Sequence, residues 1–404
     1  MMVNTIEVTS GGVTAPLGFR AAGISAGIKA DNGLDLALIV SDTPATASAV
    51  FTVNRAQAAP VLISRQHLEQ SGGVARAVVV NSGCANACTG DDGLRVAREM
   101  AVETARLVGC AVDQVLVAST GVIGVALSID KIRSGLPVAF HALAADQGPP
   151  AARAIMTTDP FPKEAAATVD IGGRLVTIGG MAKGSGMIEP MMATMLGFVT
   201  TDAKVPRALL NRALREAVND TFNAITVDGE CSTNDCVMML ANGASGAEVD
   251  PATYDSFVHA LKTVCLTLAL GIVRGGEGAT KLITVSVSGA SSEAEARRAA
   301  KAIANSPLVK TAIHGGDPNW GRLIAVAGRA GVDFDLSRAG VTIGTTVLFQ
   351  NGRPYDDAAP QAAEYLKGTD ISVSVDLGAG RASSTVWTCD LSAEYVRINA
   401  DYRT

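Results

Sequence analysis

The sequence predicts an α/β protein, and two observations support this fold class. Short apolar runs rich in β-branched residues, such as residues 75–80, alternate along the chain with segments of helical spacing, such as residues 94–108. The composition, with 48% hydrophobic and 18% charged residues, allows a large buried core. A chain of 404 residues is long enough for two or three domains, or for two halves packed closely together.

Apolar runs of strand length follow one another along the chain, bounded by polar or turn-forming residues as is typical of buried strands. Residues 371–375 and 384–387 alternate between apolar and polar side chains, which predicts an edge hairpin. The other predicted strands cover residues 34–40, 49–53, 75–80, 114–118, 175–178, 195–199, 224–227, 237–240 and 282–287.

Segments with helical spacing lie between these strands. In residues 94–108 the apolar side chains fall on one helical face, and Gly109 is expected to end the helix. Residues 251–272 form the longest predicted helix, with Asp250 as its N-cap and Pro251 in its first position. The remaining predicted helices cover residues 129–143, which Gly135 and Pro137 are expected to break in two, 207–218 and 292–305.

Charge, cysteine and histidine content exclude several classes of function. The net charge of −6 and the isoelectric point of about 5.3 provide no basic surface for nucleic acid. We find no run of eighteen apolar residues and no signal-peptide pattern, so we expect a cytoplasmic protein without a membrane segment. The seven cysteines argue against a disulfide framework, and the four scattered histidines argue against a metal site.

The central stretch of the chain, residues 181–203, is the strongest candidate for a functional segment. It places Lys183 in a glycine-rich turn, followed by a methionine-rich segment and by the pair Ala193-Thr194. A loop that leads into a buried strand would explain the apolar residues after Thr194, but not the lysine within the glycine cluster. With few histidines available as bases, an enzyme of this composition would more plausibly use a base other than histidine.

Two polar turns follow predicted strands. The segment NSGCANACTG, residues 81–90, comes after the strand at 75–80 and before the helix at 94–108, which is typical of an ordinary strand-to-helix turn. The segment STGVIG begins at Ser119, and Gly121 within it would let backbone N–H groups approach a reacting carbonyl closely. Donors placed in this way typically lower a reaction barrier by ~3 kcal/mol. By itself, however, such a turn is more often structural.

The motifs KGSGMIEPMMATML, STGVIG, GEGATKL and DPNWGR and the ending INADYRT together resemble the ornithine acetyltransferase family, the glutamate N-acetyltransferases of arginine biosynthesis. The resemblance extends from residue 12 to the C-terminus. It implies an α/β fold of mixed β-sheets sandwiched by helices, the ornithine acetyltransferase (DmpA-like) fold. It also implies self-cleavage between Ala193 and Thr194 into two interleaved chains, an alpha chain of residues 1–193 and a beta chain of residues 194–404.

The same resemblance implies roles for individual residues. Thr194 would carry the acetyl group, and Thr120 and Gly121 would stabilise the negative oxygen of the reacting carbonyl. Without the resemblance, Glu277 would be a solvated turn residue and the C-terminus a loose tail. The implied substrate-binding residues are Thr157, Lys183, Thr194, Glu277, Asn399 and Thr404. The carboxylate of Glu277 is a suitable partner for the amine of ornithine. The resemblance also implies that the asparagines of NSGCANACTG help to line the site, and that DPNWGR packs near the site without a catalytic role.

The implied reaction moves an acetyl group from N2-acetyl-L-ornithine to L-glutamate by a ping-pong route through acetyl-threonine. Neither a cofactor nor a metal is implied, and acetyl-CoA as a second acetyl donor is left open. Two alpha and two beta chains would form a heterotetramer. Two alternatives are a self-activated hydrolase of amides or peptides and a non-catalytic amino-acid-binding protein. One residue departs from the family pattern: Met191 stands where many members carry a polar residue, and we expect slower self-cleavage or altered substrate preference.

Overall fold

The structure is a computed structural model that describes residues 6–189 and 195–401. The described chain forms two compact units. The first contains residues up to 223 together with residues 230–272, and the second contains residues 224–229 and the chain from residue 273 onward. The predicted cut after Ala193 is a separate matter from this division, because it falls inside the first unit.

In the described chain, the first unit is built on a nine-stranded mixed sheet with the order β1-β6-β7-β8-β9-β3-β4-β5 and with β2 paired to β3. The pairs β8–β9 and β4–β5 are parallel, and the other neighbours are antiparallel. The strands are β1 (Glu7–Thr9), β2 (Phe19–Ile24), β3 (Leu36–Phe51), β4 (Val74–Asn81), β5 (Val115–Ser119), β6 (Lys163–Ile171), β7 (Arg174–Lys183), β8 (Leu196–Thr201) and β9 (Cys236–Ala241).

The long strand β3 joins two layers of this sheet. Its first half pairs with β2 and β4, and its second half pairs with β9. The sequence predicted two strands here, at 34–40 and 49–53, and this was wrong because the backbone stays extended between them. The pairing with β4 stops at Val40 and resumes at Ala45, and Pro44, which cannot donate to a ladder, lies in this interruption.

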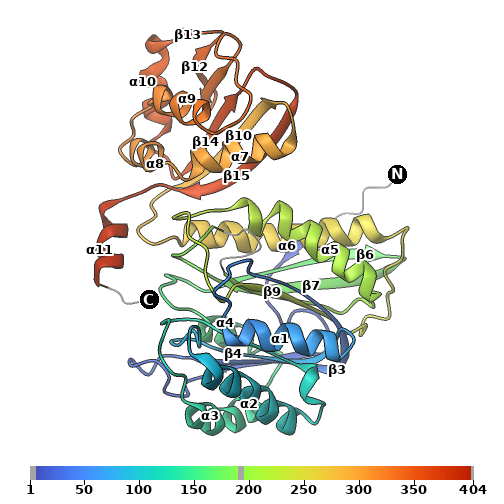
Figure 1. The fold of residues 1–404 in the computed structure, drawn as a ribbon. Coiled ribbons are helices and arrows are strands. Elements are labelled where there is room, and N and C mark those ends of the chain that lie inside the picture. Colours follow the sequence, from blue (N-terminus) through green and yellow to red (C-terminus); the bar gives the residue numbers. More distant parts are fainter. Residues whose placement is uncertain (1–5, 190–194, 402–404) are drawn as a thin grey trace. The chain divides into compact units, whose positions relative to one another are not determined.

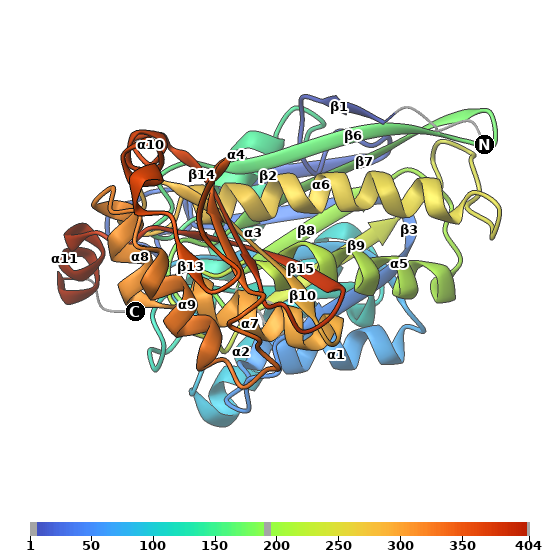
Figure 2. The same ribbon diagram turned by 90° about the horizontal axis from the view of Figure 1, so that it is seen from above.

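Helices cover both outer faces of the layered strands (Figures 1 and 2). One core lies between the helices α1 to α3 and the strands β2 to β5, and it contains Leu38 and Val79. A second core lies between the two layers of strands, and it contains Ile39 and Phe198. Adjacent residues such as Leu38 and Ile39 face different cores, so residues 36–40 of the strand are all apolar. The predicted class, mixed sheets sandwiched by helices, is therefore confirmed.

The helices of the first unit agree with the predictions in most places. The predicted helix at 94–108 begins four residues earlier, and Gly109 ends it in the left-handed conformation with φ of 72°. The predicted helix at 207–218 is α5. The bounds are α1 (Ala59–Gln70), α2 (Gly90–Val108), α3 (Ile129–His141), α4 (Gly148–Ala154), α5 (Arg207–Asp220) and α6 (Tyr254–Arg274).

Two helix predictions need correction. Helix α3 is continuous through Gly135 and Pro137, although a break was expected. Gly135 has a packing role, because a Cβ there would lie 2.8 Å from Ala26 Cβ. Helix α6 begins at Tyr254, three residues later than predicted. Asp250 caps a separate turn instead, in which its Oδ1 accepts hydrogen bonds from the N–H groups of Ala252 and Thr253, both at 2.9 Å.

By length and composition alone, helix α6 is long and apolar enough to cross a membrane. However, 56% of its most apolar stretch of 18 residues is buried inside the protein. It packs against β7, where a Cβ on Gly180 would lie 2.9 Å from Leu268 Cδ1. The apolar composition of this helix is thus accounted for by its packing in the core of the first unit.

The second unit contains a six-stranded sheet in its described part, with the order β13-β12-β11-β14-β10-β15. One face is packed by α7, α8 and α9 around a core that includes Val285, Ile303 and Val373. Its elements are β10 (Leu282–Ala290), α7 (Glu293–Ala304), α8 (Pro307–His314), α9 (Trp320–Gly328), β11 (Gly340–Ile343), β12 (Thr346–Gln350), β13 (Arg353–Pro354), α10 (Ala359–Tyr365), β14 (Asp370–Asp376), β15 (Ala382–Cys389) and α11 (Ala393–Asp401).

Two strand predictions in this unit were wrong. The segments 371–375 and 384–387 do not form a hairpin, because β14 and β15 lie on opposite sides of β10, the first parallel to it and the second antiparallel. Residues 224–227 do not form a strand. A short 3-10 helix, Phe222–Ala224, precedes a single bridge between Ile225 and Trp387. The predicted strand at 282–287 and the helix at 292–305 are both present.

Candidate active site

Three polar turns from distant parts of the sequence meet in the first unit. Strands β4 and β5 are parallel neighbours, so the turns that follow them lie at the same edge of the sheet. Asn81, at the end of β4, accepts a hydrogen bond of 2.6 Å from the Ser119 hydroxyl at the end of β5. Asn234, in the turn before β9, donates to the carbonyl oxygens of Ala85 at 2.6 Å and Ser119 at 2.9 Å.

The asparagines of the first turn have structural roles. The side chain of Asn81 also donates to the Cys84 carbonyl oxygen at 2.9 Å, and that of Asn86 donates to the Gly93 carbonyl oxygen at 2.9 Å. Both residues are buried. They hold the turn in shape, and the expectation that they help to line the site is not met by these contacts.

Gly121 occupies a position that only glycine fits. Its φ is +125°, and a Cβ there would lie 2.4 Å from the carbonyl carbon of Gly83 and 2.6 Å from the nitrogen of Cys84. The backbone of one polar turn therefore passes directly over the backbone of another. Among the described residues the Gly121 N–H has no hydrogen-bond partner, whereas the N–H of Thr120 donates to the Asn81 carbonyl oxygen at 3.0 Å.

Lys183 brings two of the predicted site residues together. Its Nζ donates to Thr120 Oγ1 at 3.1 Å and to Thr157 Oγ1 at 2.8 Å, and Lys183 itself is buried. No carboxylate within the described ranges forms an ion pair with it. An ammonium group has three hydrogens, so one donor is left for a ligand. Because Thr120 Oγ1 accepts from Lys183, its own hydrogen can point toward a different acceptor.

Asp159 anchors this cluster, and the sequence analysis did not identify it. Its carboxylate accepts hydrogen bonds from Lys163 Nζ at 2.5 Å, from the Gly184 N–H at 2.7 Å and from the Thr157 N–H at 3.0 Å. Burial by itself acts to raise the pKa of Asp159. The charges of Lys183 and Lys163, with the hydrogen bonds from Lys163 and Gly184, outweigh it and hold this pKa below its ordinary value.

Asp235 is a second buried acid that the sequence analysis did not assign. It is 2% exposed, and its Oδ2 has no hydrogen-bond partner in the part of the chain that the structure describes. Burial raises the pKa of Asp235 well above its ordinary value. The Ser232 hydroxyl, the Lys183 charge and the backbone N–H groups of Ser232 and Met195 oppose this effect without cancelling it. The only sequence signal was its place in the polar segment DGECSTNDC.

Glu277 and Asn399 meet in the second unit. Asn399, on α11, donates to Glu277 Oε2 at 2.8 Å and to the Tyr395 carbonyl oxygen at 3.0 Å. Glu277 is 6% exposed, so it is not a solvated turn residue. The next glycine, Gly278, has φ of +68°, and a Cβ there would lie 2.5 Å from the Tyr395 nitrogen. The C-terminal segment is thus helical and packed against the GEGATKL turn.

The DPNWGR segment lies in the same unit, but its tryptophan is directed elsewhere. Trp320 stacks on Phe349, with ring centroids 5.0 Å apart, and its Nε1 donates to Asp356 at 3.3 Å. His314, just before the segment, contacts Asp390 at 2.6 Å, and Asp390 accepts from the Thr280 N–H of the GEGATKL turn. Only the start of this stretch is therefore linked to the turn that carries Glu277.

The predicted site residues thus fall into two groups, one in each unit. Thr120, Gly121, Thr157 and Lys183 belong to the first unit, and Glu277 and Asn399 belong to the second. Ala193, Thr194, Met191 and Thr404 lie outside the described residues.

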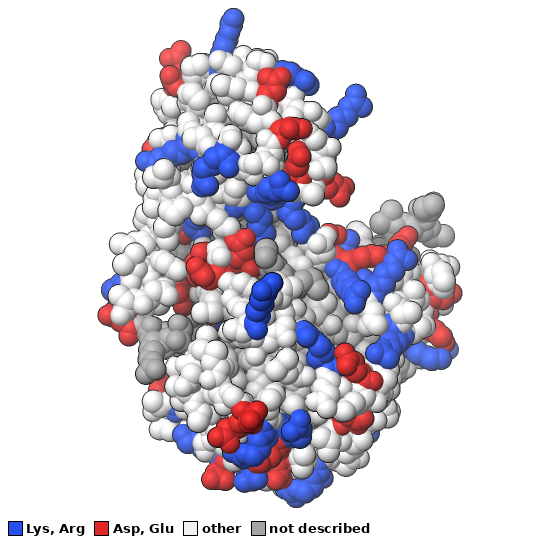
Figure 3. Space-filling model, in the orientation of Figure 1, with Lys and Arg blue, Asp and Glu red and all other residues white. Residues whose placement is uncertain are grey.

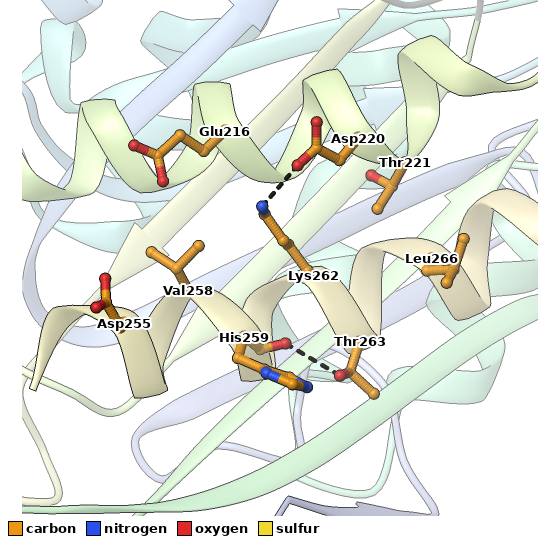
Figure 4. A pocket seen from close by; sticks show the side chains of 9 residues that line it. All are labelled: Glu216, Asp220, Thr221, Asp255, Val258, His259, Lys262, Thr263 and Leu266. Carbon is orange, nitrogen blue, oxygen red and sulfur yellow. Dashed lines mark hydrogen bonds and ion pairs between the residues drawn. The ribbon is translucent and has the colours of Figure 1, made fainter. Parts of the chain in front are cut away.

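A surface pocket of about 470 Å³ lies between α5 and α6, away from these residues (Figure 4). Lys262 on its wall pairs with Asp220 at 2.6 Å, and the Thr263 hydroxyl donates to the His259 carbonyl oxygen at 3.0 Å. None of the predicted site residues lines it. Over the face shown in Figure 3, acidic and basic side chains are interspersed, as the small net charge suggests.

The first-unit group offers donors that acyl transfer can use. A backbone N–H and a hydroxyl lie side by side and could stabilise a developing oxyanion, and a lysine beside them could hold a carboxylate. Fold and site together define an α/β enzyme of the acyl-transferring kind.

Comparison with known proteins identifies the family. The model of the ArgJ family matches residues 20–404. The arginine biosynthesis bifunctional protein ArgJ of Symbiobacterium thermophilum is 50% identical over 406 residues, covering 99% of this chain and all of that protein. The corresponding protein of a Synechococcus strain is 50% identical over 417 residues, covering all of both chains. This chain belongs to the ArgJ family.

A solved structure gives a similar result. A chain of the arginine biosynthesis bifunctional protein from Bacillus halodurans is 44% identical and superposes with a TM-score of 0.50. It matches 52% of this chain and is itself covered completely. The family resemblance inferred from the sequence motifs is therefore confirmed.

Proposed function

We propose that this protein transfers an acetyl group from N2-acetyl-L-ornithine to L-glutamate through an acetyl ester on Thr194. Membership in the ArgJ family makes the chain an acetyltransferase of arginine biosynthesis. The observation that carries the assignment of residues is the contact of Lys183 with Thr120 and Thr157 beside Gly121. This contact brings together four of the predicted site residues, Thr120, Gly121, Thr157 and Lys183. Lys183 is the last residue of β7, which precedes Thr194 in the chain.

Self-cleavage would come first. Thr194 Oγ attacks the Ala193 carbonyl carbon, the peptide C–N bond breaks, and an ester joins the two residues. Water then hydrolyses the ester, which leaves a carboxylate on Ala193 and a free hydroxyl and α-amine on Thr194. Residues 194–404 make up just over half of the chain, the same share that the solved Bacillus halodurans chain matches. This agreement in extent supports the proposed cut.

Acetyl transfer then uses the new α-amine as the base. The amine takes the proton from Thr194 Oγ, which attacks the acetyl carbonyl of N-acetylornithine. The Thr120 hydroxyl and the Gly121 N–H donate to the oxyanion, and ornithine leaves with the proton on its amine. Glutamate then attacks the acetyl-threonine ester by the same steps in reverse, which yields N-acetylglutamate and the free hydroxyl.

Charged groups would fix the two amino acids. Lys183, with one donor free of contacts in the described chain, would bind a substrate carboxylate. Glu277, oriented by Asn399, would bind the amine of ornithine. Thr404 and Thr157 complete the proposed binding set. No part of this route requires a metal or a bound cofactor.

Three further properties are proposed from the family. The relatives named bifunctional suggest that acetyl-CoA also donates an acetyl group to glutamate, as a substrate. We propose a heterotetramer of two alpha and two beta chains and a cytoplasmic location. The partners would be the small-molecule substrates, with no nucleic acid and no membrane.

The experiment that tests the proposal compares the intact mass of the purified protein with that of its Thr194→Ala variant. We expect two fragments divided between Ala193 and Thr194 in the wild type and one chain in the variant, with acetyl transfer lost in the variant. A single wild-type chain that still transfers acetyl would overturn the self-cleavage step. Release of acetate from N-acetylornithine without any need for glutamate would favour the hydrolase alternative.

A further inference from the structure

The ion pair between Asp159 and Lys163 is the most deeply buried one of the described chain. The exposed fractions of the two side chains are 0% and 2%, and Asp159 Oδ1 lies 2.5 Å from Lys163 Nζ. A Cβ on Gly271 of α6 would lie 3.3 Å from Lys163 Cγ, so the lysine stem is packed against this helix. Burying an ion pair in this way is costly, and its presence needs a reason beyond stability.

The pair lies directly beside the lysine proposed to bind substrate. Asp159 Oδ1 also accepts from the N–H of Gly184, the residue after Lys183, and its Oδ2 accepts from the N–H of Thr157, whose hydroxyl contacts Lys183. The positive charge of Lys183 also acts to lower the pKa of Asp159. One buried carboxylate therefore has two neighbouring ammonium groups, and it forms its ion pair with Lys163.

We propose that Lys163 is a positioning residue that occupies Asp159 and thereby keeps the Lys183 ammonium available for a substrate carboxylate. The charges of Lys163 and Asp159 cancel, which leaves Lys183 as the positive charge of the cluster. Lys29, a further cation close enough to feel the charges of Asp159 and Lys183, donates to the Leu34 carbonyl oxygen at 2.8 Å, and within the described chain it forms no ion pair with Asp159. This inference rests on the proposed role of Lys183.

Removal of the Lys163 charge would leave Asp159 buried without its partner. The nearest replacement is Lys183, which would turn from Thr120 and Thr157 toward Asp159. A buried carboxylate without a partner is strongly unfavourable, so the pull on Lys183 is large. The substrate carboxylate would then lose its partner.

The test is a double-mutant cycle on the self-cleaved enzyme, with acetyl transfer to glutamate as the assay. Lys163→Met keeps most of the stem and removes the charge, and we expect the KM for glutamate to rise by about tenfold, in line with the loss of a charge-assisted hydrogen bond. Adding Asp159→Asn removes the competing carboxylate and is expected to return KM to near the wild-type value. Lys204→Met, in the exposed pair with Glu248, is the matched control and should leave KM unchanged.

Other outcomes separate this inference from the proposed function. A tenfold rise in KM with Lys183→Ala but none with Lys163→Met would overturn the inference alone. No change with Lys183→Ala would overturn the role of Lys183 itself. If Lys163→Met does not accumulate as folded protein, Lys163→Gln takes its place. A double variant whose KM remains as high as that of the single variant would show that Lys163 acts only through packing.

Discussion

At the scale of single residues, the space and the hydrogen bonds around Gly121 distinguish the proposed oxyanion donor from an ordinary structural turn. The N–H of Thr120 is used within the fold, and the N–H of Gly121 is left over. A neighbouring glycine, Gly124, provides a comparison, since its φ is also positive, at +78°, but a Cβ there would have nothing within 4 Å. Both glycines thus have a positive φ, and they differ in the space that surrounds them.

Gly121→Ala is expected to reduce kcat for acetyl transfer by about a hundredfold or more, because the added Cβ pushes the Gly83 backbone away and displaces an oxyanion donor. Gly124→Ala is the control, and it should cost only about 1 kcal/mol of stability from its positive φ while kcat stays near the wild-type value. Steady-state kinetics and thermal unfolding of both variants check this. Equal losses of kcat in the two variants would contradict it.

The buried Asp235 predicts a pH dependence of stability. Its raised pKa means that the folded protein keeps a proton that the unfolded chain releases above about pH 4, so the free energy of unfolding should fall as pH rises through the interval between the two values. Asp235→Asn removes this proton linkage. Urea unfolding at several pH values from 4 upward should therefore show the wild type losing stability relative to the variant. Parallel curves would refute the assignment.

At the scale of elements, α11 brings Asn399 to Glu277, the residue proposed to bind the amine of ornithine. Its residue Asn399 reaches Glu277, which is 122 positions earlier in the sequence, and the helix packs on the turn that carries this acid. Arg397 on the same helix is instead paired with Glu394 at the surface. Residues two positions apart on α11 therefore have different roles.

Asn399→Ala is expected to raise the KM for N-acetylornithine by about tenfold and to change that for glutamate little, because Glu277 loses the hydrogen bond that orients it toward the donor amine. Arg397→Ala should leave both constants unchanged, since the pair it breaks is exposed. Initial rates with each substrate varied in turn measure both constants. An equal rise for both substrates would argue against a specific role at the ornithine amine.

Local sequence patterns predicted the elements that depend on local physics. The helix at 94–108 has one clear apolar face and a glycine stop, and the strand at 75–80 is rich in valine; both are present. Strand β6 was missed because its sequence, KEAAATVDI, is rich in alanine and charge, and it is extended only through pairing with β7. The continuity of β3 and the sides taken by β14 and β15 depend on partners far away in the sequence.

Family motifs predicted several residues of the candidate site that are in contact in the structure, and they did not mark the buried acids beside them. Lys183, Thr120 and Thr157 were identified from motifs, and the structure brings them into contact. Asp159 ends the segment MTTD, residues 156–159, in which the resemblance marks Thr157 and not the acid, and an acid in a proline-broken loop is usually solvated. Its role depends on Gly184, 25 positions later, so it becomes visible only when the chain is folded.

At the scale of the molecule, the proposed cut would leave the two fragments interleaved. Strand β8, from the beta chain, pairs with β7 of the alpha chain, and β9, also from the beta chain, pairs with β3 of the alpha chain. Main-chain hydrogen bonds and core contacts thus cross between the fragments along two separate ladders.

We therefore expect the cleaved fragments to elute together in size-exclusion chromatography under native conditions and to separate only in denaturant. The reason is that the contacts between β7 and β8 and between β9 and β3 do not depend on the peptide bond that is cut. Denaturing electrophoresis of the native peak checks this. Elution of either fragment alone without denaturant would contradict the interleaved arrangement.

Strands β7 and β8 pair antiparallel, with Lys183 opposite Leu196. In the uncut precursor both strands belong to one chain, so they first pair as neighbours within the same molecule. Cutting the connection makes the same pairing an encounter between two molecules, with a dependence on concentration that the precursor never has. The mature protein would then be assembled once and not readily again. Its persistence in the cell would be governed by how slowly it comes apart, and lost copies would be replaced by new synthesis and not by refolding.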